Sequence, residues 1–243
     1  MRRLTICSAL IVLLAGILAG CGRRVLTGRG EVVQEARIAA AFDKVVISAP
    51  LSADIQIAPG ATSSIELTGH KNLLEQIETT VSGGTLKISL KDAITLDNDN
   101  ELKAQIRVAN LSQLKLKGVA DAVVKGPISG SGFDLDISGA GDAEIEQVQV
   151  NKLTATISGA GDVTIDQGRC EQAEFTVSGA GNINTFGVQG SHVRAKVSGA
   201  GDVEVYALKS LDARVSGAGT IRYKGKPQVS SKTSGIGEIV AAN

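Results

Sequence analysis

The sequence predicts an all-β solenoid, a fold in which short coils of the chain stack along one axis. Six copies of the pentapeptide Ser-Gly-Ala-Gly-Asp, or close variants of it, begin at Ser138, Ser158, Ser178, Ser198, Ser216 and Ser234. Their spacings are 20, 20, 20, 18 and 18 residues, and a period in this range is typical of solenoids. Apolar and polar residues alternate on both sides of each copy, which is the period of a β-strand.

Each repeat therefore predicts two strands joined at a sharp corner. Around Ser158 the apolar positions are Leu153, Ala155 and Ile157 before the corner, and Val163 and Ile165 after it. Coils stacked about 4.8 Å apart pair every strand with its copies and enclose a continuous core, so seven coils span roughly 29 Å. Glycine tolerates positive φ and has no side chain, which suits such a corner. The alanine between the glycines fits a corner with little interior room.

The ends of the array depart from the repeat. The segment Lys117–Asp121 keeps the first Gly and the Asp but loses the second Gly, and we expect the stack to begin there. In the last corner Ile236 replaces Ala and Glu238 replaces Asp. Terminal repeats are often atypical caps, so we expect the larger Ile236 to cover the open end, with plain sequence drift as the alternative.

The first half of the chain predicts shorter strands broken by turns. We expect strands at 45–47, 53–57, 65–67, 86–90 and 102–108, a turn at Pro59-Gly60 and a hairpin at Gly83-Gly84. One helical turn is expected at 72–77, capped by Asn72. The acidic segment 92–101 has no apolar alternation and predicts an exposed loop.

The composition excludes several classes of protein. The chain has 25 basic and 25 acidic residues, so the basic footprint of a nucleic-acid-binding protein is missing and no such partner is expected. Aromatic residues make up only 2% and there are 29 glycines, which suits a thin, regular β core. Gly-Ala-Gly is not followed by a helix or by a Lys-Ser/Thr pair, so it is no phosphate cradle, and we expect no cofactor.

Residues 1–20 predict a secretory signal, with Arg2 and Arg3 before an apolar stretch at 10–18. The following Leu18-Ala19-Gly20-Cys21 resembles a bacterial lipobox, which implies cleavage before Cys21 and its acylation, a stable membrane anchor when more than one chain is attached. A plain signal peptide or an uncleaved anchor is the alternative. Gly22 stands where an Asp signals inner-membrane retention, so the resemblance implies sorting to the outer membrane of a two-membrane bacterium.

The mature chain then divides into three parts. Residues 21–30 form a lipidated tether whose arginines either contact lipid phosphates or are simply solvated. Residues 31–116 form an irregular β region continuous with the solenoid, and residues 117–243 form the regular repeats. Cys170 is the one remaining thiol and has no partner for an internal disulfide. We interpret it as a small structural residue near a turn rather than a reactive thiol.

Several of these features resemble one family of bacterial cell-envelope proteins. They are the entry Phe42-Asp43-Lys44-Val45, the strand at 51–57, Leu73-Leu74, the hairpin at 83–86 and the Gly-Ala-Gly-Asp corners. The chain is similar over residues 40–240 to proteins with a head GIN domain, which are described as autotransporter adhesins. The resemblance implies a right-handed parallel β-helix of the pectin-lyase type without a recognised catalytic set.

One candidate ligand or cation site is a column of acidic residues just after the corners. It consists of Asp121, Asp142, Asp162, Asn182 and Asp202. The simplest interpretation is that each side chain caps amides of its own glycine-rich turn. Stacked carboxylates are also suitable calcium ligands, and pairs of them reach the separations used by glycosidases.

The sequence offers little else for catalysis. A uniform column makes its carboxylates alike, whereas acid-base enzymes hold two carboxylates in unlike environments. His70 and His192 lie in unrelated contexts and support neither a triad nor a metalloprotease motif. No base recurs beside the serines of the corners, whose hydroxyls we expect to bond backbone groups. The chemistry therefore predicts neither a catalytic residue nor a metal centre.

The sequence as a whole predicts a lipid-anchored, non-catalytic binding or structural module of the cell envelope, acting in adhesion or envelope organisation. A polysaccharide-acting lyase or glycosidase and a calcium-binding solenoid are the alternatives. The expected partners are the membrane, a glycan or envelope protein, and a second copy through the open coil ends. Few aromatics are available for stacking on sugars: Phe186, Tyr206 and Tyr223, the last of which we expect to pack inward.

Overall fold

The structure is a computed structural model that describes residues 24–38, 40–91, 94–96 and 102–242. The predicted signal segment, Cys21 and most of the acidic segment 92–101 lie outside the described residues. The described chain is a β-solenoid of about six turns with coils of about 20 residues, and 70% of it is strand. The predicted all-β solenoid is confirmed. The sequence predicted seven coils, against about six turns in the structure.

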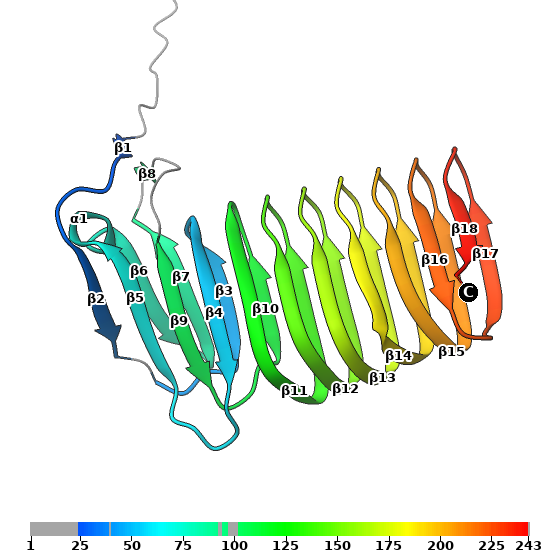
Figure 1. Cartoon of the computed structure of the whole chain (residues 1–243), viewed down its shortest axis with the longest axis horizontal. Coiled ribbons are helices and arrows are strands. Elements are labelled where there is room, and N and C mark those ends of the chain that lie inside the picture. The colour runs from blue at the N-terminus through cyan, green and yellow to red at the C-terminus, as the bar shows by residue number, and fades with distance from the viewer. Residues whose placement is uncertain (1–23, 39, 92–93, 97–101, 243) are drawn as a thin grey trace, which may run out of the picture.

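Two parallel sheets form the long sides of the solenoid, and five long strands bend from one to the other (Figure 1). These long strands are β11 (Ala120–Ile137), β12 (Ala143–Ile157), β13 (Val163–Val177), β14 (Ile183–Val197) and β15 (Val203–Val215). Face 1 contains their last parts together with β3 (Lys44–Ser48), β10 (Gln113–Leu116) and β17 (Gln228–Thr233). Face 2 contains their first parts together with β4 (Leu51–Ile57), β9 (Lys103–Val108), β16 (Thr220–Lys224) and β18 (Glu238–Ala241).

The pairing continues without a break from the regular repeats into the first half of the chain. β10 pairs with β3, and β11 pairs with β4, both in parallel. The stack therefore does not begin at Lys117, as the degenerate corner suggested, but includes strands whose connections lack the pentapeptide. The repeat does not identify this earlier coil, because β3 and β4 are joined by a short connection and not by a glycine corner.

Antiparallel strands and one short helix close the N-terminal end. The strands are β2 (Val32–Arg37), β5 (Ser64–His70), β6 (Ile77–Ser82) and β7 (Thr85–Leu90), and the helix is α1 (Lys71–Leu74). Gly83 and Gly84 form the predicted hairpin turn with φ of +56° and +73°. Asn72 does not cap the helix, because His70 occupies the N-cap. The Asn72 side chain instead accepts from the Arg29 amide and donates to the Thr27 carbonyl.

Two short strands complete the described chain, and one of them corrects a prediction. β1 (Arg24–Leu26) pairs in parallel with β8 (Ile94–Leu96). β8 lies within the segment 92–101 that was expected to be an exposed loop, and Leu96 is buried. Among the described residues, no helix is long and apolar enough to cross a membrane.

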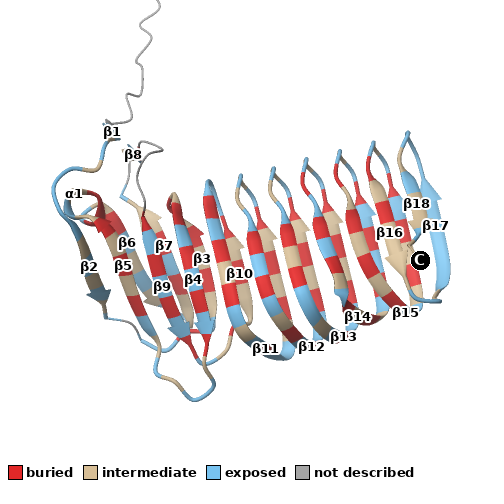
Figure 2. Cartoon of the chain, viewed as in Figure 1, coloured by how far each residue is buried: buried red, intermediate tan, exposed pale blue. Residues whose placement is uncertain are grey.

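The core is one continuous cluster of buried, mostly aliphatic residues between the two faces. Figure 2 shows buried residues recurring along the strands of both faces. In β12 every second residue is buried on each long side, for example Ile145 on face 2 and Ala155 and Ile157 on face 1. A third, short side links the two faces, and its inward residues include Val150 and, at the same register one coil later, Cys170. Cys170 therefore packs as a core residue.

The glycines of the corners are required by close stacking of the backbone. A Cβ on Gly159 would lie 1.9 Å from the carbonyl oxygen of Gly139, and one on Gly161 would lie 2.1 Å from that of Gly141. The first and last corners alone contain positive-φ glycines, Gly118 and Gly235, among the described corners. The expectation of positive φ is thus wrong for the inner corners, where contact between coils decides the residue.

The alanine between these glycines points outward, contrary to the expectation that interior room limits its size. Ala140, Ala160 and their counterparts are exposed on the ridge of the corners. Ile236 continues this ridge and has 86% of its surface exposed, so it does not cover the open end of the stack. The tip of each corner is convex, which directs its side chain into solvent.

Candidate functional site

The predicted acidic column exists as a ladder of side-chain hydrogen bonds along the edge of face 2. Each member accepts the backbone N–H of the corresponding residue in the next coil. Asp121 Oδ1 accepts from Asp142 at 3.0 Å, Asp142 Oδ1 from Asp162 at 2.8 Å, and Asp162 Oδ1 from Asn182 at 2.9 Å. The ladder continues from Asn182 Oδ1 to the Asp202 amide at 3.0 Å and from Asp202 Oδ1 to the Thr220 amide at 2.9 Å.

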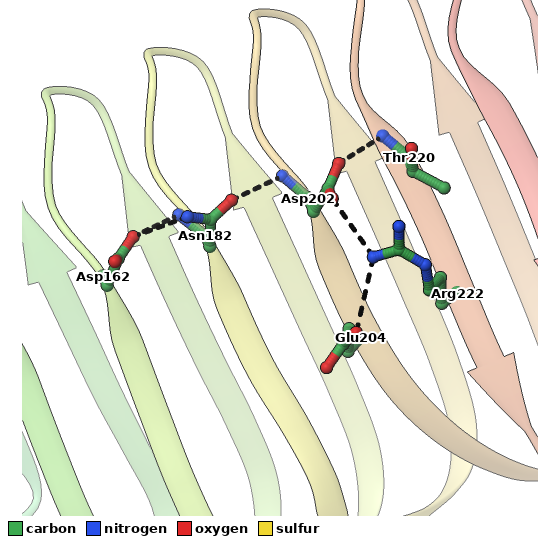
Figure 3. A network of polar contacts seen from close by, with 6 residues as sticks. All are labelled: Asp162, Asn182, Asp202, Glu204, Thr220 and Arg222. Carbon is green, nitrogen blue, oxygen red and sulfur yellow. Dashed lines mark hydrogen bonds and ion pairs between the residues drawn. The ribbon is translucent and has the colours of Figure 1, made fainter. Parts of the chain in front are cut away.

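The ladder differs from the expected cap within one turn, because it ties consecutive coils together. Hydrogen bonds with a charged acceptor are stronger than neutral ones, and they offset repulsion between like charges about 5 Å apart. Two features lower that repulsion at the C-terminal side (Figure 3). Asn182 is neutral and donates its Nδ2 to Asp162 at 2.9 Å. Arg222 bonds both Asp202, at 3.1 Å, and Glu204, at 3.4 Å.

The ladder leaves one oxygen of each early carboxylate directed to solvent. The Oδ2 atoms of Asp142 and Asp162 have no hydrogen-bond partner among the described residues, and both side chains are exposed. Within the same part of the chain, no group of three or more His, Cys, Asp or Glu side chains is arranged to hold a metal ion. In each of these carboxylates, one oxygen therefore has a structural role in the ladder, and the other is accessible to solvent.

The two histidines lie at opposite ends of the solenoid, and the contacts of His192 were not predicted. His192 Nδ1 lies 2.8 Å from Ser210 Oγ, and its Nε2 lies 3.8 Å from Glu171 Oε1. Glu171 also lies 3.4 Å from Lys209 Nζ. The pKa of its carboxyl is held below the usual range by hydrogen bonds, first from the Ser191 side chain and then from Lys209, and less by the charge of His192. About half of the His192 and Glu171 side chains is exposed, so water solvates them. The contact links neighbouring coils and lacks the desolvation that activates a serine nucleophile.

A shallow groove lies on face 1 over the last coils, and its volume is about 520 Å³. Two outward rows of side chains line it. The first row runs Lys152, Gln172, His192, Ser210 and Gln228, and the second runs Glu174, Arg194, Asp212 and Ser230. Members of a row stand on adjacent strands, about 4.8 Å apart.

A third outward row borders the groove on the side of the corners and is basic at its end. We call Lys196, Arg214 and Lys232 the basic row, since they occupy the same register on β14, β15 and β17. All three are exposed. The basic row can be recognised in the sequence, because each of its residues lies two positions before a corner serine. Inspection of the corner residues alone does not reveal it.

The three aromatic residues of the repeats are dispersed rather than gathered at the groove. Tyr223 is partly buried and packs on the core, as predicted. The ammonium group of Lys224 lies 4.2 Å from the centre of the Phe186 ring, which occupies that ring in a cation-π contact. Tyr206 is also partly buried. None of the three lines the groove on face 1.

The free thiol Cys170 is buried beneath the short side and does not form a reactive site. Only 3% of its surface is exposed. Burial, together with the negative charge of Glu171, raises the pKa of Cys170 to about 11. Since the thiolate is the nucleophile, the protein keeps this sulfur in its unreactive form at neutral pH.

Two solved structures similar to this chain are described as putative adhesins. A structure described as a putative adhesin from Bacteroides fragilis NCTC 9343 is 25% identical, with a TM-score of 0.85, and the match covers 89% of this chain and all of the other. A putative adhesin from Parabacteroides merdae ATCC 43184 matches with 21% identity and a TM-score of 0.72, over 90% of this chain and 99% of the other.

A third solved structure shares the fold under a different description. It is a putative lipid binding protein from Parabacteroides distasonis ATCC 8503, with 22% identity, a TM-score of 0.74 and coverage of 90% of this chain and all of the other. A comparison with curated proteins gave no match. The family model described as "Putative auto-transporter adhesin, head GIN domain" matches residues 41–227. The chain therefore belongs to the head GIN domain family of adhesin-like proteins.

Proposed function

We propose that this protein is a lipid-anchored, non-catalytic adhesion module of the bacterial cell envelope. The observation that supports the proposal most directly is the regularity of its outer faces. Each coil presents polar side chains in fixed register with the coils on either side, so the solenoid offers extended rows of binding groups rather than one pocket. Such a surface suits a repetitive polymer, and the family is described in terms of adhesion.

The N-terminal sequence supports anchoring at Cys21 in the outer membrane. Leu18-Ala19-Gly20-Cys21 follows an apolar signal segment, and two or more acyl chains are sufficient for stable attachment. The segment 21–30 then connects the anchor to the N-terminal end of the solenoid, where its β1 pairs with β8. The repeats extend away from this end (Figure 1), so a binding face near the C-terminus lies far from the first described residues.

The experiment is an adhesion assay with cells that produce the full chain. We expect these cells to bind glycan-coated or host-cell-coated surfaces more strongly than cells without the protein, and to incorporate labelled palmitate at Cys21. Cys21→Ser is the matched variant, which should abolish labelling and release the protein from the membrane. Equal adhesion of producing and non-producing cells would refute the adhesive function, while labelling of Cys21→Ser would refute the anchor.

The acidic ladder is a second candidate binding element, because the Oδ2 atoms of Asp142 and Asp162 face solvent without a partner in the described structure. Carboxylate oxygens are the usual ligands of calcium. The test is calcium titration of the full chain and of a variant with Asp142, Asp162 and Asp202 all changed to Asn. Asn retains the side-chain oxygen that accepts the amide, as Asn182 does, so the variant keeps the ladder while removing three of its four negative charges. Calcium binding that is equal in both proteins would exclude the ladder as the site.

A further inference from the structure

The groove on face 1 and the basic row beside it differ in charge from the rest of the solenoid surface. Five cationic side chains lie on the outward rows of this region, namely Lys152, Arg194, Lys196, Arg214 and Lys232, against the carboxylates of Glu174 and Asp212. The region therefore carries a local positive charge in a chain whose formal net charge is zero.

Ion pairs within the groove neutralise only part of this charge. Asp212 accepts hydrogen bonds from Nε and Nη2 of Arg214, each at 3.1 Å, and lies 3.6 Å from Arg194. Glu174 lies 3.8 Å from Arg194. No acidic side chain of the described chain lies within ion-pair distance of Lys196 or Lys232. These two ammonium groups are the free charges that an anionic ligand would meet.

Face 2 is acidic over its middle coils. β12, β13 and the corners before them place Asp142, Glu144, Asp162 and Asp166 on outward positions of face 2 or its edge. An anionic ligand is therefore attracted to the groove side of face 1 and repelled from this part of face 2. Complementary potential of this kind sets the orientation of a ligand more than its affinity.

The lining of the groove favours a carbohydrate over other anions. Ser210, Gln228 and Ser230 contribute neutral hydroxyl and amide groups, which donate to and accept from sugar hydroxyls. Binding of single-stranded nucleic acid relies on aromatic stacking platforms, and the groove has no aromatic lining. Binding of a membrane surface combines inserted apolar side chains with attraction to charged lipids, and the one exposed apolar residue among the lining residues is Val229, at 38% exposure.

We propose that the groove on face 1 binds a linear, negatively charged polysaccharide that lies along the solenoid axis against the basic row. The axial direction follows from the register, because like groups recur on successive strands only along that axis. This inference rests on the proposed adhesive function and specifies its ligand class and its site.

The test measures binding of the full chain, held in detergent micelles, to polygalacturonate, which carries a carboxylate on each sugar. Dextran is the uncharged comparison. We expect polygalacturonate to bind, dextran not to bind, and affinity to fall as salt rises from about 0.05 to 0.5 M, since salt screens exposed charges. The variant Lys196→Gln/Lys232→Gln should bind polygalacturonate about tenfold more weakly, with each lost surface pair contributing roughly threefold.

A matched control removes the same number of charges elsewhere. Lys87→Gln/Lys125→Gln changes one lysine on face 1 near the N-terminal end and one on face 2, and should leave affinity within about twofold. Equal losses in both variants would overturn the assignment of the site. Equal binding of dextran, or no binding of polygalacturonate by the unmodified protein, would overturn the ligand class.

Two further outcomes separate this inference from the proposed function. Cells that produce the Lys196→Gln/Lys232→Gln variant are compared in the adhesion assay with cells that produce the unmodified protein. If both adhere equally well, and better than non-producing cells, the adhesive function is supported and the groove is excluded as its site. Vesicles of phosphatidylglycerol supply an anionic surface without sugar. Binding to these vesicles that depends on Lys196 and Lys232, without binding to polygalacturonate, would overturn the carbohydrate assignment in favour of a lipid surface.

Discussion

Replacement of Gly159 by alanine tests why the corners contain glycine. We explain the glycine by close contact with the backbone of the preceding coil and not by a positive φ. The added Cβ would lie 1.9 Å from the carbonyl oxygen of Gly139. Gly132 provides a matched site, where an added Cβ would lie 3.3 Å from the nearest atom, the Lys152 carbonyl oxygen. Neither glycine has a positive φ, so the two substitutions differ in the room available and not in backbone strain.

The expected cost follows from these distances. To reach the 3.3 Å contact of the control site, the corner at Gly159 must move by the difference from 1.9 Å, or 1.4 Å. The same Gly139 oxygen accepts the Ala160 amide at 2.9 Å, and a shift of that size breaks this bond. Loss of one hydrogen bond costs about 1 kcal/mol, and overpacking in a close-packed site costs about 1–3 kcal/mol. We therefore expect Gly159→Ala to lower the free energy of unfolding by about 2–4 kcal/mol.

The assay is urea unfolding followed by far-ultraviolet circular dichroism, with the full chain in detergent. Gly132→Ala should cost less than about 1 kcal/mol, because its neighbour needs to move only a few tenths of an ångström. Coils of a solenoid can unfold separately, so both midpoint and slope are compared. Equal destabilisation by the two substitutions would refute the explanation of the corners by close backbone contact.

Four further predictions concern three side chains. Asn182→Asp should destabilise the fold by about 1 kcal/mol in low salt, because it inserts a charge between Asp162 and Asp202; recovery in high salt supports this, and a stabilising effect refutes it. Cys170 should react with a thiol reagent at pH 8 only on unfolding, and rapid reaction of native protein contradicts its burial. Because its pKa is raised to about 11 from 9.0, the stability it contributes is complete below pH 9 and declines as pH rises toward 11, which urea midpoints across that range measure. Thr185→Val should cost about 1 kcal/mol, since the buried hydroxyl donates to a carbonyl of the next coil at 2.8 Å; an unchanged midpoint contradicts this.

The repeats could be predicted from the sequence because each position faces a copy of itself. Alternation before Ile157 and after Val163 is sufficient to assign which side of each strand is buried. The direction of Ala160 could not be assigned in this way, because alternation stops where the chain bends. The antiparallel pairing of β2 with β5 was also not predictable, since partners of irregular strands depend on tertiary contacts rather than on a repeat.

The candidate site was predicted in part for the same reason. The positions of Asp142 and Asp162 in one column follow from the period alone, but the donor that each carboxylate binds depends on the height of the next coil. Only the structure shows that this donor is the amide of the following Asp or Asn. The basic row is also predictable from the repeat period, when each outward position of one coil is compared with the equivalent position of the next coil.

Inward and outward residues of one coil are under different constraints, which explains how a uniform scaffold can carry a local binding site. Inward residues and corner glycines are constrained by neighbours above and below, as the 1.9 Å approach at Gly159 shows. Outward residues such as Thr176 and Lys196 occupy equivalent register positions and differ in charge without any change in the backbone that carries them. A coil can therefore exchange a neutral surface residue for a basic one at little cost in stability. The fold fixes the spacing of ligand contacts, while the outward residues of individual coils decide which ligand is bound.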